Sequence, residues 1–185
     1  EISECLVGSE MCIRDRTEPE IVLPSNQACL RLPGIDGKAK MSKSIGNCIN
    51  LSDEPEVIQK KIMSMYTDPT HLRKDDPGHT EGNPVFIYLD AFCKPEYFPQ
   101  FLPEYSSLEE LKAHYERGGL GDVTVKKFLN AVVQEELRPI RERRKMWEGR
   151  LPDVMDILRS GTKVARGKAA QTLQEVREAM QINYW

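Results

Sequence analysis

The chain has 185 residues, of which 39% are hydrophobic and 30% are charged, and its formal net charge at pH 7 is −3. This composition predicts a soluble, helix-rich globule of one domain or one and a half, and it excludes nucleic-acid binding driven by overall charge. No apolar run approaches the roughly 18 residues that span a bilayer, and no signal peptide is visible, so we expect no membrane association.

The five cysteines are odd in number and include no Cys-x-x-Cys pair. This pattern predicts neither a disulfide framework nor a zinc site. The three histidines lie apart from the cysteines in the sequence, so we expect no metal held by protein side chains. Reduced thiols are typical of the cytosol, and we therefore expect a cytoplasmic location.

The first part of the chain shows little regular patterning. Residues 1–16 have neither strand alternation nor a helical face, and the chain does not begin with Met. We expect this segment to be non-native or disordered, joined to a gene fragment. Residues 20–23 are a short apolar run that could be a strand or an extended arm, and residues 29–32 could be a second short strand before Pro33 and Gly34.

The next stretch, residues 34–47, combines glycine and asparagine with three lysines. Gly and Asn permit positive φ and close backbone approach, and lysines on such a loop suit phosphate oxygens. Serine hydroxyls and loop amides add further donors to an anion. The residues alone therefore suggest polyphosphate handling, although the loop lacks P-loop spacing. The alternative is a solvated connector.

A capping box of Asp53 and Glu56 predicts a helix to about Tyr66, with Pro55 in its first turn. Its apolar face is predicted to contain Val57, Ile58, Ile62 and Met65. Residues 67–83 then form a long polar loop, a kind of segment that is often functional. Its two histidines, at positions 71 and 79, are interpreted as ordinary solvated residues, while Arg73 and Lys74 are candidates for RNA contact.

Two further helix starts are visible. Asn83 followed by Pro84 predicts a helix that ends before Pro95, with Val85, Phe86, Leu89 and Phe92 buried. Ser107 and Glu110 form another capping box, and this helix is predicted to run to Arg117 and to end at the glycines of residues 118–121.

Asp122 is predicted to cap a long helix with Val125, Phe128, Leu129, Val132 and Val133 on its buried side. Pro139 predicts a kink or break within it. After residue 150 we expect one helix containing Val154, Ile157 and Leu158, a turn at residues 161–162, and a second helix whose apolar stripe runs from Val164 to Met180.

The densest basic run lies around and after Pro139 and includes Arg138, Arg141, Arg143, Arg144, Lys145 and Arg150. One interpretation is a solvated helix face with intrahelical ion pairs. The other is a patch that contacts the tRNA backbone, in which case each neutralised phosphate would steepen the salt dependence of binding.

One motif carries a resemblance. Lys40-Met41-Ser42-Lys43-Ser44 resembles the second signature loop of class I aminoacyl-tRNA synthetases. The flanking residues 32–37 and 46–53 narrow the resemblance to the tyrosyl and tryptophanyl branch. Residues 81–92 are similar to the start of the helical domain in tryptophanyl-tRNA synthetases of one bacterial type, and they favour that family over the tyrosyl one.

The resemblance implies a mainly α chain that covers the C-terminal portion of a tryptophanyl-tRNA synthetase. Residues 17–52 would end a Rossmann-type α/β catalytic domain, including the signature loop, and residues 53–185 would form a helical, anticodon-binding-type domain. Residues 1–16 match nothing in the family. The first family signature, His-x-Gly-His, and the strands of the tryptophan pocket are absent from the chain, so we expect this chain alone to be inactive.

The implied reaction of the complete enzyme is activation of tryptophan by ATP, with Mg²⁺ accompanying the nucleotide, and transfer to tRNA. Lys43 is the expected catalytic cation, and Lys40 supports it. Lys40, Met41, Ser42, Lys43 and Ser44 are the expected ATP-binding residues. The resemblance also implies a homodimer for the complete enzyme, whose dimer surface lies largely outside this chain. A tyrosyl-tRNA synthetase fragment and a free-standing helical RNA-binding module are the alternatives.

Overall fold

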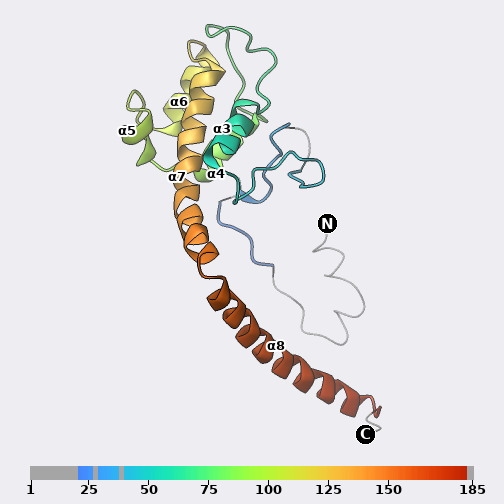
Figure 1. Ribbon diagram of the computed structural model, residues 1–185. Coiled ribbons are helices and arrows are strands. Elements are labelled where there is room, and N and C mark those ends of the chain that lie inside the picture. Colours follow the sequence, from blue (N-terminus) through green and yellow to red (C-terminus); the bar gives the residue numbers. More distant parts are fainter. Residues whose placement is uncertain (1–20, 27–28, 38–39, 183–185) are drawn as a thin grey trace. The chain divides into compact units, whose positions relative to one another are not determined.

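A computed structural model describes residues 21–26, 29–37 and 40–182, and all regular elements within these ranges are helices (Figure 1). They are α3 (Pro55–Met63), α4 (Pro84–Phe92), α5 (Tyr97–Phe101), α6 (Leu108–Arg117), α7 (Asp122–Glu148) and α8 (Leu151–Ala179). The prediction of a mainly α chain is confirmed. Residues 29–32, considered as a possible short strand, form none. The extended pairing in the described residues is one isolated antiparallel bridge between Pro33 and Lys40. Residues 1–16 lie outside the described part.

The chain divides into two compact units, Glu1–Glu136 and Leu137–Trp185. The core of the first unit is built by α3, α4, α5, α6 and the part of α7 that belongs to it (Figure 1). Its rings pack closely: the centroids of Phe86 and Tyr115 are 4.8 Å apart, and those of Phe98 and Phe128 are 5.0 Å apart. Phe98 comes from α5, a short helix that the sequence pattern did not predict.

Two predicted helix starts are confirmed. The Asn83 side chain accepts a hydrogen bond from the Val85 amide at the start of α4. The Ser107 side chain accepts one from the Glu110 amide at the start of α6. Each cap satisfies an amide that the helix itself leaves unpaired. Arg117 ends α6 as predicted, and Gly118 follows with φ of 87°, a conformation that favours glycine.

The capping box predicted for α3 is wrong. Glu54 occupies the N-cap position and makes no side-chain capping bond. The Asp53 carboxylate instead accepts hydrogen bonds from Asn50 and from the Lys61 ammonium. The helix also ends at Met63, short of the predicted Tyr66, and Val57 is exposed on its surface although the three other predicted apolar residues are buried.

The buried Lys126 of α7 explains where α3 ends. Its ammonium donates to the carbonyl oxygens of Met63 at 3.1 Å and Met65 at 2.6 Å. These carbonyls lie at or just beyond the helix terminus, where the helix offers them no internal partner. Burial lowers the pKa of Lys126.

The polar loop between α3 and α4 is confirmed as irregular, but it is not simply solvated. The side chain of His71 is 1% exposed, and its Nδ1 lies 3.1 Å from a carboxylate oxygen of Asp122. The interpretation of His71 as a solvated histidine is therefore wrong. Asp122, predicted as a cap, is itself the first residue of α7 and also accepts a hydrogen bond from the Tyr115 hydroxyl.

Pro139 was predicted to kink or break the helix, and a break is absent, since α7 continues through this residue to Glu148. The five apolar residues predicted on the buried side of α7 are all buried. The turn predicted at residues 161–162 is also wrong, since α8 is one continuous helix of 29 residues. None of its described residues is buried. No helix in the described part of the chain is long and apolar enough to cross a membrane.

Candidate functional site

The tip of the loop at residues 40–47 is a short turn that presents its lysine to solvent. The Gly46 amide donates to the carbonyls of Ser42 and Lys43, both at 3.2 Å, and Gly46 has φ of 75°. The Ser42 and Ser44 hydroxyls lie 2.8 Å apart. Lys43 and Ser44 are exposed, so their donors are available to a ligand that approaches from solvent.

All five predicted site residues lie on this loop. Lys40 is exposed, while Met41 and Ser42 are half-buried. Within the residues that the structure describes, neither the Lys40 nor the Lys43 ammonium makes a hydrogen bond or ion pair. A lysine without an internal partner retains all three donors for an anion.

The base of the loop is held together by Asn47, which is buried. Its Oδ1 accepts a hydrogen bond of 2.8 Å from the Ser42 amide. Its Nδ2 donates to Asp36 Oδ1 at 3.2 Å and, in a longer contact of 3.4 Å, to the Lys40 carbonyl. Its own carbonyl accepts from the Ile35 amide at 2.9 Å. One side chain therefore connects the start of the loop to its tip.

The residues after Asn47 are fixed by Lys61 from α3. The Lys61 ammonium donates to the Cys48 carbonyl at 2.9 Å and also pairs with Asp53. Burial works against the charged form of Asp53, but the hydrogen bonds from Lys61 and Asn50 outweigh it and lower the pKa of this carboxyl. The exit of the loop is thus attached to a helix of the core.

The entry to the loop is fixed by Tyr88 from α4. The Tyr88 hydroxyl donates to the Pro33 carbonyl at 2.8 Å. Burial raises the pKa of Tyr88 to about 12, so the hydroxyl keeps its proton and remains a donor at neutral pH. A backbone bond adds to this attachment: the amide of Tyr66, just after α3, donates to the Ile35 carbonyl.

The sequence analysis did not identify Lys61 or Tyr88, and it considered the asparagine of the loop only as a residue that permits positive φ. The lysine and the tyrosine lie on helices whose apolar spacing drew attention to other positions. The only sequence signal for Asn47 is its place directly after the third glycine of a lysine-rich loop, and an asparagine there is equally consistent with a turn.

A metal site is not indicated by the described residues, which contain no group of three or more His, Cys, Asp or Glu side chains able to hold an ion. The exposed lysines of the loop are the groups that could receive an anion.

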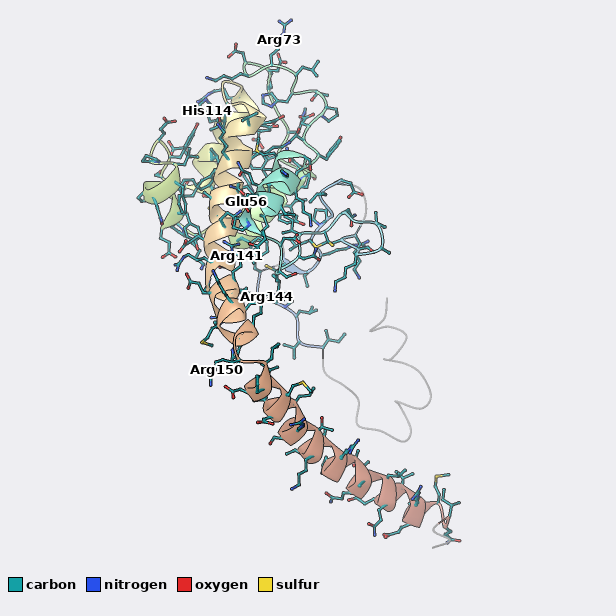
Figure 2. All side chains as sticks on the ribbon, viewed as in Figure 1. Glu56, Arg73, His114, Arg141, Arg144 and Arg150 are labelled. Carbon is teal, nitrogen blue, oxygen red and sulfur yellow. The ribbon has the colours of Figure 1, made fainter. Side chains whose placement is uncertain are left out.

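The basic run of the second unit contains ion pairs, in agreement with the interpretation of a solvated helix face. Arg138 pairs with Glu142, Arg144 with Glu148, and Arg150 with Asp153. The Arg150 guanidinium also lies over the Trp147 ring, 5.1 Å from its centroid. Figure 2 shows Arg141, Arg144 and Arg150 along this stretch. The exposed pairs can exchange partners at little cost, so the tRNA-contact interpretation stays a prediction.

Comparison with known proteins gives consistent matches. A model of the family described as tRNA synthetases class I (W and Y) matches residues 6–138. The tryptophan–tRNA ligase of Clostridium longisporum is 56% identical over 180 residues, which is 97% of this chain and 49% of that protein. The tryptophan–tRNA ligase of Streptococcus pyogenes serotype M3 is 49% identical over 168 residues, covering 91% of this chain and 47% of that protein.

A solved structure is similar as well. The tryptophanyl-tRNA synthetase from Campylobacter jejuni, complexed with ADP and tryptophan, matches with a TM-score of 0.66 and 29% identity. The match covers 82% of this chain and 43% of that one. The chain thus spans about half the length of the curated relatives and of the solved structure.

Proposed function

The chain belongs to the class I tRNA synthetases for tryptophan and tyrosine, and from this premise we propose that it is part of a tryptophan–tRNA ligase. Tryptophan is favoured over tyrosine because the two relatives described above, at 49% and 56% identity, are tryptophan–tRNA ligases. The resemblance of residues 81–92 to the tryptophanyl family supports the same choice. The complete enzyme would work in the cytoplasm as a homodimer.

The observation that carries the proposal is the exposed ammonium of Lys43 at the tip of a loop whose base is hydrogen-bonded to the core. In the activation step the carboxylate of tryptophan attacks the α-phosphorus of ATP, and the bond to the bridging oxygen of pyrophosphate breaks. Negative charge accumulates on the leaving pyrophosphate, which departs with its Mg²⁺. A cation that meets this charge mainly in the transition state raises the rate rather than the affinity.

The other loop residues have supporting roles in this proposal. Lys40 adds a second cation, and the hydroxyls of Ser42 and Ser44, 2.8 Å apart, can donate to phosphate oxygens. Met41 is half-buried and packs the loop. The Gly46 turn gives the tip a conformation that can close over the nucleotide, as catalytic lids do.

We propose that residues 17–52 complete a Rossmann-type catalytic domain and that residues 53–185 bind tRNA. Supporting this division, the helices of the described part all begin at or after residue 55. The basic run would contact the tRNA backbone after exchange of its exposed ion pairs. Its residues are Arg138, Arg141, Arg143, Arg144, Lys145 and Arg150. The family match begins at residue 6 and so includes part of residues 1–16, against the expectation that this segment matches nothing in the family; no role is proposed for it.

The test is a chimera in which the first half of the Clostridium longisporum ligase is joined to residues 17–185. We expect tryptophan-dependent exchange of pyrophosphate into ATP. Lys43→Ala should reduce its rate by about 10²–10³-fold, or roughly 3–4 kcal/mol, by analogy with loss of one preorganised donor. Lys127→Ala, which removes another exposed lysine, is the matched control. A chimera that exchanges with tyrosine instead, or an unchanged rate in Lys43→Ala, would refute the proposal.

A further inference from the structure

We infer that Asn47 is a positioning residue that sets where the Lys43 ammonium stands when the loop meets the nucleotide. The inference rests on the proposed function and adds to it the group that preorganises the catalytic cation. A cation is effective in a transition state only if its position is fixed before the reaction, so the residue that fixes it affects the rate without touching the substrate.

The contacts of Asn47 are divided between the two ends of the loop. On one side are Asp36 and Ile35, and on the other are the Ser42 amide and the Lys40 carbonyl. The two backbone groups on the tip side lie directly before and after Met41, and Ser42 is the neighbour of Lys43 in the chain. Holding both of them fixes the direction in which the chain enters the turn that presents Lys43.

Because Asn47 is buried, breaking its hydrogen bonds would be costly. Asn47 is 4% exposed, the lowest value along residues 40–47, in a segment whose tip residues 43–46 are all exposed. A buried carboxamide that lost its partners would leave polar groups unpaired, which disfavours rearrangements that break the set. The tip can therefore move, while its base stays in one arrangement.

Gly34 is shaped to receive this side chain. A Cβ placed on Gly34 would lie 2.1 Å from Nδ2 and 2.5 Å from Cγ of Asn47. Gly34 does not have positive φ, so its lack of a side chain is needed for space and not for backbone conformation. The glycine and the carboxamide form one packed unit at the base of the loop.

The chemistry also explains why the residue is asparagine. The Ser42 amide requires an acceptor, whereas Asp36 and the Lys40 carbonyl require a donor, and a carboxamide supplies both. Aspartate at this position would keep the acceptor, lose the donor and place a second carboxylate beside Asp36. Substitution of Asp36 by asparagine would return a donor to that pair.

The first experiment uses the chain of 185 residues itself. Trypsin cleavage after Lys43 is followed by mass spectrometry in the native protein and in Asn47→Ala. We expect cleavage roughly tenfold faster in the variant, because the local opening that admits the protease loses buried hydrogen bonds. Asn83→Ala is the control, since Asn83 is equally buried at 4% exposure but caps α4. Equal acceleration in both variants, or none in Asn47→Ala, would overturn the inference.

The second experiment is a double-mutant cycle in the chimera. Asn47→Ala should lower kcat for pyrophosphate exchange by about 10²-fold with little change in KM, as displacement of a catalytic group by about 1 Å does. In the Lys43→Ala background the same substitution should cost less than about threefold, because no cation remains to be positioned. A purely structural role would give equal costs in both backgrounds and would overturn the inference.

A rescue variant covers the case in which Asn47→Ala does not fold. Asn47→Asp should lower kcat, and Asp36→Asn added to it should restore at least about a tenth of the native kcat. Failure of rescue together with unchanged proteolysis would refute the inference while leaving the proposed function intact. An inactive native chimera would refute the proposed function, and the catalytic part of this inference with it; the trypsin experiment would then judge only whether Asn47 holds the loop.

Discussion

Two helices of similar length, α7 and α8, show how differently one sequence pattern can be used. Both carry apolar residues at helical spacing. In the first part of α7, Leu129 and Val132 are fully buried, whereas in α8 Leu158 is 59% and Val164 is 74% exposed. Apolar spacing therefore determined that each segment is a helix, but it did not determine whether the chain itself covers the apolar face.

The largest expected effect comes from paired truncations of the apolar faces. Leu129→Ala should lower the free energy of unfolding of the first unit by about 2–5 kcal/mol, because it leaves a cavity in a packed core. Leu158→Ala on α8 should change the free energy of unfolding of the chain by less than about 0.5 kcal/mol, as surface substitutions usually do. Urea denaturation followed by circular dichroism measures both variants against the native chain.

The opposite result for Leu158→Ala would show that α7 and α8 do not differ in this way. A cost of several kcal/mol for Leu158→Ala would mean that the apolar stripe of α8 is covered in solution. Repeating the measurement at several protein concentrations would then separate cover by a second copy, which depends on concentration, from cover within the chain, which does not.

The second pair of variants compares a buried lysine of α7 with an exposed lysine of α8. Lys126→Ala removes the ammonium that holds the Met63 and Met65 carbonyls. We expect a loss of about 2–3 kcal/mol, because charged hydrogen bonds are lost and buried carbonyls are left unpaired. Lys163→Ala removes an exposed lysine of α8 and should be neutral within about 0.5 kcal/mol. A cost for Lys126→Ala as small as that expected for Lys163→Ala would show that the hydrogen bonds from Lys126 to the end of α3 contribute little to stability.

A third pair tests the pH dependence of the loop between α3 and α4. Asp68 accepts hydrogen bonds from Thr70 and His79, and its side chain is 6% exposed. Burial raises the pKa of Asp68, but the bonds from Thr70 and His79 outweigh it and hold the pKa well below its usual range. Because the folded pKa lies well below the unfolded value of about 3.9, the stabilisation is complete above about pH 5. It is lost progressively as the pH falls below the unfolded pKa towards the lowered folded pKa.

Asp68→Asn should therefore cost about 1–2 kcal/mol at pH 7 and should flatten the decline of stability between about pH 5 and pH 2. Asp156→Asn, which removes an exposed carboxylate paired with Arg159 on α8, should leave both the stability and its pH dependence unchanged. Denaturation curves at several pH values measure the difference, and an unaltered decline in Asp68→Asn would contradict the assignment.

These pairs also show what the sequence could predict. The local signals at Asn83 and Ser107 located two helix starts, because a capping side chain bonds within its own turn. The family motif located the loop that contains Lys43. The roles of Asn47, Lys61 and Tyr88 depend on contacts between segments far apart in the chain or on burial of a single side chain. Such contacts and such burial leave no periodic pattern in the sequence. Asp53 is a further example, because it lies in a capping sequence but its carboxylate bonds to Lys61 instead.

The smallest expected effect concerns helix capping, and it compares hydroxyls in the two regions. Ser107→Ala removes the acceptor for the Glu110 amide at the start of α6 and should cost about 1 kcal/mol. The Thr172 hydroxyl on α8 donates to the Lys168 carbonyl, which already belongs to the helix ladder. Thr172→Ala should therefore be neutral or slightly stabilising, because alanine has the higher helix propensity. Urea denaturation measures Ser107→Ala, and helicity by circular dichroism measures Thr172→Ala. A cost for Thr172→Ala comparable with that of Ser107→Ala would show that α8, like α6, depends on individual side-chain contacts for its structure.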